Sequence, residues 1–269
     1  MRTLVHLSDL HFGRVDERLL QPLIAAVERI APNLLVVSGD LTQRARTQQF
    51  KQARAFLDAL PAPRLVVPGN HDVPLYNVLA RMLHPLDKYQ RYVAEDLEPF
   101  FGDEEIAVVG INSARSLAIK NGRINRQQLA QVRARLAHLP DTVTRVVVTH
   151  HPVDLPHGAA GEDLVGRAGL AMETFADCRV DLLLSGHLHH GDIGNTATRY
   201  PIKGHSALVI HAGTATSTRR RGEVNSFNVV RVNRPEVAVE RWVWDAAGGI
   251  FSAEAAKGFA LKSGGWQAR

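Results

Sequence analysis

The chain has 269 residues and a formal charge of +5, and its 45% hydrophobic and 22% charged residues are typical of a water-soluble globular protein. No run of about 18 apolar residues is present, so we expect no membrane-spanning helix. The segment MRTLVHLSDLHFG at the N-terminus lacks the unbroken apolar stretch of a signal peptide. Cys178 is the only cysteine, which excludes an intramolecular disulfide and favours a cytoplasmic location. The modest positive charge favours phosphorylated or polyanionic substrates.

The first part of the chain, residues 1–190, alternates predicted strands and helices. In chain order, apolar spacing and turn residues predict a strand at 3–8, a helix at 17–30, a strand at 34–38, a helix at 48–60, strands at 65–67 and 106–111, a helix after an N-cap at Asn125, and strands at 146–149 and 182–185. Such alternation indicates an α/β protein.

After residue 190 the pattern changes to predicted strands without strong helices between them, at 207–211, 226–232 and 237–244. We expect these strands of segment 191–245 to form a second sheet, packed against the first within one domain that spans residues 1–269. The glycine-rich tail at 246–269 gives no clear prediction of order.

Polar residues follow the predicted strands at the points where the strands end. Five short segments share this placement: Asp9-x-His11, Gly39-Asp40, Gly69-Asn70-His71-Asp72, His150, and Gly186-His187-x-His189. In open α/β sheets, ligand sites lie beyond the carboxyl ends of the strands. A glycine before the polar residue allows the tight turn that brings the side chain up to a ligand. Each segment alone is weak evidence, but the five together predict one site.

The residue types in these segments indicate a metal site with two ions. Carboxylate, amide and imidazole ligands suit Zn, Mn, Fe or Co better than Ca or Mg. Seven ligand positions exceed the three or four protein ligands of one zinc, whereas two ions that share a bridging carboxylate use all seven. Such a pair of ions, about 3.5–4 Å apart, stabilises the attacking and leaving oxygens of a phosphoryl displacement.

The five segments, in this order over residues 9–189, resemble the motifs of the calcineurin-like metallophosphoesterases, and most of all those of bacterial class III cyclic-nucleotide phosphodiesterases and glycerophosphodiesterases. The resemblance implies a four-layer α/β/β/α sandwich of two mixed sheets flanked by helices. It also implies that Asp9, His11 and His189 hold one ion, that Asn70, His150 and His187 hold the other, and that Asp40 bridges them.

The implied activity is hydrolysis of phosphodiester bonds in cyclic nucleotides or other small phosphodiesters, by a hydroxide formed between the two ions. The resemblance makes His71 the candidate general acid. Asp72 either orients the ring of His71 or only caps its loop. The candidate substrate contacts are Asn70, His71, Asn112, Arg219 and Arg221. Because neighbouring side chains on an extended segment point to opposite sides, we expect His151 and His190 to face away from the ligands.

The alternative predictions for the same site are nuclease activity, phosphomonoesterase activity and hydrolysis of a lipid-linked pyrophosphate. The basic charge favours nucleic acid, but no stripe of alternating aromatic and basic residues supports it. No amphipathic cap segment favours a lipid substrate, although residues 76–92 form a candidate lid. A non-enzymatic scaffold is disfavoured because no ligand position is degenerate. The metals loaded, the leaving group and the oligomeric state are not predicted.

Overall fold

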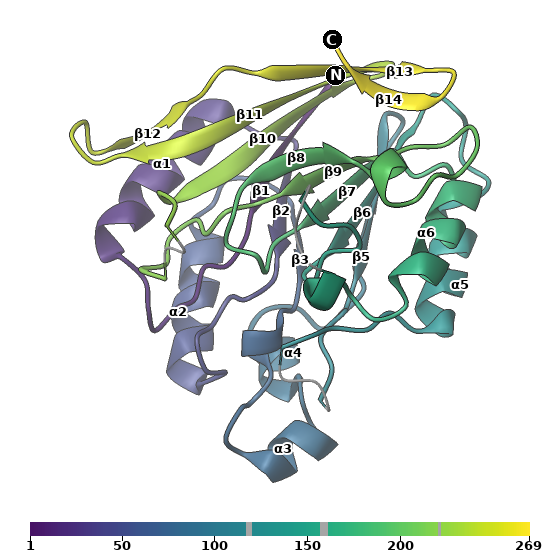
Figure 1. The fold of residues 1–269 in the computed structure, drawn as a ribbon. Helices are drawn as coiled ribbons and strands as arrows, with labels where there is room; N and C mark the ends of the chain where they lie inside the picture. The colour runs from purple at the N-terminus through teal and green to yellow at the C-terminus, as the bar shows by residue number, and fades with distance from the viewer. Residues whose placement is uncertain (117–119, 157–160, 220–221) are drawn as a thin grey trace.

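The computed structural model describes residues 1–116, 120–156, 161–219 and 222–269, which form two face-to-face β-sheets flanked by helices (Figure 1). The first sheet contains, in spatial order, β14 (Gly265–Ala268), β13 (Lys257–Lys262), β11 (Glu236–Asp245), β10 (Ser226–Asn233), β1 (Arg2–Leu7), β2 (Leu34–Ser38) and β3 (Arg64–Val67), with β12 (Ile250–Ala253) paired to β11. The strands β1, β2 and β3 run parallel, and β10 pairs antiparallel with β1.

The second sheet has a parallel centre and antiparallel edges. Its spatial order is β4 (Phe100–Gly102), β5 (Ile106–Ile111), β6 (Thr144–Thr149), β7 (Leu182–Ser185), β9 (Leu208–His211) and β8 (Asp192–Asn195). The strands β5, β6, β7 and β9 are parallel, whereas β4 and β8 pair antiparallel with their neighbours. Both sheets are therefore mixed.

Helices lie on the outer face of each sheet (Figure 1). The helices are α1 (Leu20–Ile30), α2 (Thr47–Asp58), α3 (Val78–Leu83), α4 (Asp87–Tyr92), α5 (Arg126–Leu136) and α6 (Ala168–Asp177), with 3-10 turns at Glu17–Leu19, Asn70–Asp72, Gly161–Asp163 and Thr196–Thr198. In Figure 1, α1 and α2 lie on one side of the sandwich, α5 and α6 on the other, and α3 projects beyond the rest of the molecule.

Alternate residues of the central strands pack in different hydrophobic cores. Because both faces of these strands are buried, their sequences are unbroken apolar runs. Val36 of β2 and Val148 of β6 lie in the core between the two sheets. Val37 packs instead in the core under α1 and α2, and Val147 in the core under α5 and α6. Three cores thus separate four layers, and the expected α/β/β/α sandwich is confirmed.

Most predicted elements agree with the structure to within two residues. The strands predicted at 34–38, 106–111 and 182–185 have the observed bounds. The helix predicted at 17–30 begins with a 3-10 turn at Glu17–Leu19. The expected N-cap is present, since Asn125 accepts a hydrogen bond from the backbone N–H of Gln128.

The expected allocation of the later strands to a separate second sheet is wrong. β9 joins β7 in the second sheet, whereas β10 and β11 extend the first sheet from β1. The apolar pattern of a strand records which faces are buried, but it does not record which strand supplies its hydrogen bonds. The tail forms β12, β13 and β14, and its Trp266 is buried with the indole N–H on Asp181 Oδ1 at 2.9 Å.

No helix in the described part of the chain has both the length and the apolar character that a bilayer crossing requires.

Candidate metal centre

The segments that follow β1, β2, β3, β6 and β7 meet at one edge of the sandwich. The strands β1 to β3 are parallel within their sheet and β6 and β7 within theirs, so the residues after each strand collect at that edge. The structure brings the seven expected ligands together there, as two neighbouring groups.

The first group contains Asp9, His11, Asp40 and His189, whose candidate ligand atoms all lie within 4.8 Å of one another and whose side chains are buried. The Nε2 atoms of His11 and His189 are 3.2 Å apart. Asp9 Oδ1 lies 3.2 Å from His189 Nε2 and 3.6 Å from His11 Nε2. Asp40 Oδ2 lies 3.7 Å from His11 Nε2.

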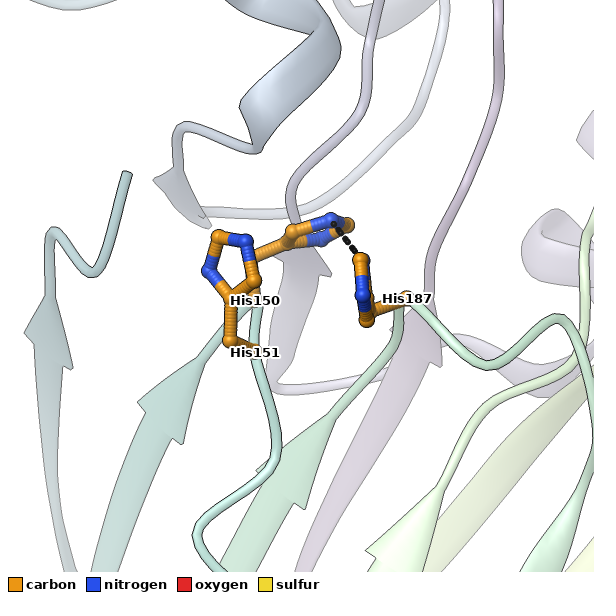
Figure 2. Close-up of side chains that lie close together, drawn as sticks. All are labelled: His150, His151 and His187. Atoms are coloured by element: carbon orange, nitrogen blue, oxygen red, sulfur yellow. Dashed lines mark hydrogen bonds between the residues drawn. The ribbon is translucent and has the colours of Figure 1, made fainter. Parts of the chain in front are cut away.

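The second group contains Asn70, His150 and His187. His150 Nε2 lies 3.1 Å from Asn70 Oδ1 and 3.3 Å from His187 Nδ1 (Figure 2). It also lies 3.4 Å from Asp40 Oδ1, the oxygen that does not face His11. The two oxygens of Asp40 therefore face different groups, which is the placement that a bridging carboxylate requires.

The hydrogen bonds of the histidines leave nitrogen lone pairs directed into the two groups. His150 Nδ1–H donates to Ser38 O at 2.8 Å, and His189 Nδ1–H donates to Arg219 O at 3.0 Å. In this tautomer the Nε2 atom of each ring carries a lone pair. Asp9 Oδ1 is buried and accepts no hydrogen bond from the described residues. Clustered lone pairs and an unsatisfied buried carboxylate oxygen are unfavourable unless a cation lies between them, so this donor set fits metal ions.

The electrostatic environment keeps the two central carboxylates ionised. Burial alone would raise the pKa of Asp9, but its interactions with His189 and His11 outweigh burial and hold that pKa well below its usual range. Burial also opposes ionisation of Asp40, and His150 and His71 lower its pKa despite that. Both groups are therefore ligand-competent at neutral pH.

The imidazoles divide into two kinds. Burial lowers the pKa of His187 to about 4, with the charge of His150 as a further cause. Burial likewise lowers the pKa of His189. For His150, burial is outweighed by the carboxylates of Asp40 and Asp9, which raise its pKa. Neutral rings are the forms that bind metal ions.

The backbone at the ligands is unusual. Five non-glycine residues have left-handed φ values between 51° and 70°: Asp9, His11, Asp40, His187 and His189. Such conformations cost of order 1–3 kcal/mol each and persist only where the surroundings enforce them, mostly at functional sites. Gly69 is equally constrained, because a Cβ atom there would lie 2.1 Å from Asp40 Oδ1.

Hydrogen bonds from other segments hold the carboxylates in place. Asp9 Oδ2 accepts from Ser8 Oγ at 2.6 Å and from the backbone N–H of His187 at 3.0 Å. Thr214 Oγ1 donates to the carbonyl oxygen of Asp9 at 2.7 Å. Asp40 Oδ1 accepts from the backbone N–H of His71 at 2.8 Å. Outer contacts of this kind fix the orientation of metal ligands.

His71, the candidate acid, lies beside the first group and is partly exposed. Its ring is 4.9 Å from that of His11. Its Nδ1–H donates to Gln43 O at 2.9 Å, and its Nε2 accepts from the Arg219 guanidinium at 3.0 Å. Burial lowers the pKa of His71 against the opposing effect of Asp40.

Asp72 does not orient the ring of His71, which corrects that part of its expected role. Its carboxylate accepts hydrogen bonds from the backbone N–H groups of Leu41, Thr42 and Gly69 and from Thr42 Oγ1. It therefore ties the loop after β2 to the loop after β3. Burial and the charge of Asp40 raise the pKa of Asp72 to about 6. The Gln43 carbonyl takes the orienting position, and a backbone contact of this kind has no sequence signature.

His151 lies beside the ligands and not on the opposite side, contrary to expectation. Its ring centroid is 4.7 Å from that of His187 and 4.9 Å from that of His150 (Figure 2). The prediction assumed an extended backbone, but β6 ends at Thr149 and the chain bends there. Its Nε2–H donates to Lys120 O and its Nδ1 accepts from Ser113 Oγ, so both nitrogens have partners outside the cluster.

The remaining candidates differ in position. Arg219 contacts His71 through its side chain and His189 through its carbonyl oxygen. Asn112 is nearly buried, and its Oδ1 accepts from the backbone N–H of Ala114 at 3.0 Å. His190 is exposed, and its Nδ1 contacts the carboxylate of Glu223. Arg221 lies outside the described residues.

Comparisons with known proteins agree with this geometry. A family model described as calcineurin-like phosphoesterase matches residues 2–191. The chain is 29% identical, over 60% of its own length and 60% of the relative's, to the glycerophosphodiester phosphodiesterase GpdQ of Enterobacter lignolyticus. It is 24% identical, over 69% of each chain, to the 3',5'-cyclic adenosine monophosphate phosphodiesterase CpdA of Escherichia coli K12.

Solved structures share the fold at low identity. A dimetal phosphatase from Danio rerio has a TM-score of 0.66 and 15% identity, with 89% of this chain and 95% of that chain covered. The purple acid phosphatase PPD1 from yellow lupin has a TM-score of 0.72 and 12% identity, with 95% of this chain and 53% of that chain covered. At these identities the likeness concerns the fold alone.

Proposed function

The chain belongs to the calcineurin-like phosphoesterase family, and from that membership we propose that it hydrolyses small phosphodiesters, including cyclic nucleotides, at a dinuclear metal centre. The observation that carries the proposal is the position of Asp40, whose two oxygens face two separate groups of metal-ligating side chains. The names of the bacterial relatives, a glycerophosphodiesterase and a cyclic-nucleotide phosphodiesterase, support a diester substrate. Because the chain spans 60% of the length of the first of these relatives, its substrate is part of the proposal.

The seven ligands would hold the ions, with Asp9, His11 and His189 on one, Asn70, His150 and His187 on the other, and Asp40 on both. When bound, two such ions supply an activated water near neutral pH and neutralise charge on the phosphoryl oxygens. Manganese, iron and zinc all suit this mixture of oxygen and nitrogen donors. Burial of the ligand side chains excludes bulk water from all but the open side of the site.

We propose that His71 moves a proton to the leaving oxygen. Its Nδ1–H stays on Gln43 O, so Nε2 is the atom that exchanges a proton with substrate. In this structure that atom accepts a hydrogen bond from Arg219. Nε2 therefore carries a lone pair here, and it can donate only after the guanidinium turns to a phosphoryl oxygen and Nε2 takes up a proton from solvent water. His71 and Arg219 would thus act as a pair on the substrate.

A second candidate is a phosphoester with a lipid or other apolar substituent, because the candidate lid is apolar on its outside. Tyr76, Val78, Leu79, Met82 and Leu83 are 60–76% exposed. Tyr76 lies under the guanidinium of Arg44, next to the loop that holds His71, so this surface adjoins the site. Contiguous exposed apolar side chains commonly mark binding surfaces.

A substrate panel with defined metals tests both candidates. Protein loaded separately with Mn, Fe or Zn is assayed on bis-p-nitrophenyl phosphate, cyclic AMP, cyclic GMP, short- and long-chain glycerophosphodiesters, p-nitrophenyl phosphate and single-stranded DNA. We expect two ions per chain and a kcat/KM for small diesters at least about 10-fold above that for the monoester. Preference for the long-chain ester would select the second candidate.

Three outcomes would contradict the proposal. Faster hydrolysis of the monoester would make the protein a phosphomonoesterase. DNA cleavage whose substrate affinity falls steeply with salt would make it a nuclease. Protein that binds two ions and hydrolyses nothing in the panel would be a scaffold.

A further inference from the structure

A pocket of about 540 Å³ beside the metal centre is lined by Arg115, Arg123 and Arg167 together with Ser116, Asn121 and Gly122. We refer to it as the arginine pocket. Its size is within the range of small-molecule sites. No aspartate or glutamate is among its described lining residues. All three arginines thus contribute to one concave surface.

The three arginines form no ion pair with a carboxylate of the described residues, although the charge of Glu98 acts on Arg115. Arg115 donates to the carbonyl oxygens of Asn112 and Ala114 and to Gln128 Oε1, all of them uncharged acceptors. The side chains of Arg123 and Arg167 form no hydrogen bond or ion pair within the described part of the chain, and both are exposed. Burial lowers the pKa of Arg115, and the charges of Arg123 and Arg167 lower it further, although Glu98 opposes them. The three cations thus repel one another.

The backbone holds two of these arginines side by side. The backbone N–H of Arg123 donates to Ser113 O at 2.9 Å, and that of Gly166 donates to Gly122 O at 2.8 Å. Arg123 and Gly166 form a parallel bridge, so Arg167 follows directly on the same paired segment. The backbone that carries Arg123 and Arg167 is therefore ordered and keeps the two residues on paired segments.

One histidine ring separates the arginine pocket from the metal ligands. A Cβ atom on Gly122 would lie 2.2 Å from His151 Nδ1, so the backbone of Gly122 packs directly on that ring. The other side of His151 faces His187, with ring centroids 4.7 Å apart (Figure 2). The Gly122 wall of the arginine pocket and the metal ligand His187 therefore pack against the same histidine ring.

We propose that the arginine pocket binds a phosphate group, separate from the phosphodiester that the metal ions would hold. Guanidinium forks match phosphate oxygens in geometry and charge, and a multiply charged oxyanion offsets the repulsion among three arginines. The group is either a phosphate on the far part of the substrate or free phosphate. The affinity of the pocket for phosphate does not depend on the proposed hydrolysis, whereas a role in substrate selection does.

The test removes two of the charges and counts bound phosphate. Metal-loaded wild-type protein and the double variant Arg123→Gln/Arg167→Gln are titrated calorimetrically with inorganic phosphate. We expect the variant to bind one phosphate fewer, or to bind it about 10- to 100-fold more weakly, as the loss of charge-assisted hydrogen bonds implies. The double variant Lys51→Gln/Lys262→Gln, which removes equal charge from exposed positions outside the pocket, should match the wild type. Equal phosphate stoichiometry and affinity in all three proteins would overturn the proposal.

A matched pair of substrates identifies the source of the phosphate. Thymidine 5'-(4-nitrophenyl phosphate) is compared with the same compound carrying a 3'-phosphate. A higher kcat/KM for the 3'-phosphorylated compound in the wild type, absent from the arginine variant, assigns the pocket to substrate. A phosphate site lost from the variant without such a preference in the wild type assigns it to free phosphate. Failure of the wild type to hydrolyse any diester would contradict the proposed function and leave the titration valid.

Discussion

The floor and the rim of the candidate site differ in how they are built. The floor, defined as Asp9, His11, Asp40, Asn70, His150, His187 and His189, is buried except for Asn70 and follows directly on sheet strands. The rim, defined as His71, Arg219 and α3, is partly or fully exposed and comes from loops and a short helix. Backbone carbonyls orient two rings of the floor, His150 and His189, whereas the ring of His71 is held by the Gln43 carbonyl on Nδ1 and by the Arg219 side chain on Nε2.

This difference separates two tasks. Buried ligands on strained, well-supported backbone give a fixed position for the ions. Exposed side chains can change partner when a substrate arrives, and Arg219 must release Nε2 of His71 before that atom can be protonated and act as a donor. We therefore expect floor variants to lose metal, and rim variants to keep metal but lose rate.

The largest effect is expected for Asp40→Ala, which removes the carboxylate that faces both ligand groups. Metal content should fall from two ions per chain to one or none, and kcat/KM should fall by more than about 10³-fold, since two-ion catalysis depends on both ions. Metal analysis by mass spectrometry and a bis-p-nitrophenyl phosphate assay measure both. Asp58→Ala, on the exposed end of α2, is the control. A variant that retains two ions would show that Asp40 does not bridge.

A smaller effect is expected for His71→Ala. Loss of the proton donor should lower kcat by about 10²–10⁴-fold, the usual size of acid–base catalysis, while two ions remain bound. His138→Ala, at an exposed position just after α5, should leave kcat unchanged. If His71→Ala also lost metal, His71 would belong to the floor, and the division between floor and rim would be wrong.

The smallest effect is expected for Arg219→Ala. The substitution removes the guanidinium but leaves the carbonyl oxygen that holds His189, so metal content should not change. We expect kcat/KM to fall by about 10-fold, the value of a charge-assisted hydrogen bond to the phosphoryl group. Lys51→Ala serves as a charge-matched control on α2. An unchanged kcat/KM would remove Arg219 from the substrate contacts.

The sequence predicted the floor well because its residues lie next to elements with strong local signals. Asp40 follows a strand that the apolar run at 34–38 identified to the residue, and His187 follows another at 182–185. The rim was less predictable. The carbonyl groups of Gln43 and Arg219 orient His71 and His189, and any residue type has a carbonyl. The position of His151 depended on the bend of the chain after β6, which the correctly predicted strand end at residue 149 does not reveal.

The later strands were misplaced for a related reason. β9 and β10 are both largely buried strands, yet they join different sheets. What separates them is pairing over long distances in the chain, such as β10 on β1, which no local pattern records. The arginine pocket was likewise not foreseen, because its three arginines come from two separate loops.

The bond from Thr214 Oγ1 to the carbonyl oxygen of Asp9 joins residues 205 positions apart, and the bond from His187 to the carboxylate of Asp9 spans 178. We expect contacts between such distant residues to form late in folding. Closing so long a loop costs chain entropy before the new contacts stabilise the structure. During synthesis, the chain cannot complete its first ligand group until His189 has left the ribosome. Metal uptake would then follow folding and stabilise only the finished protein. The rate of metal loading during refolding would accordingly report the last step of assembly, when the start of the chain and its final third come together.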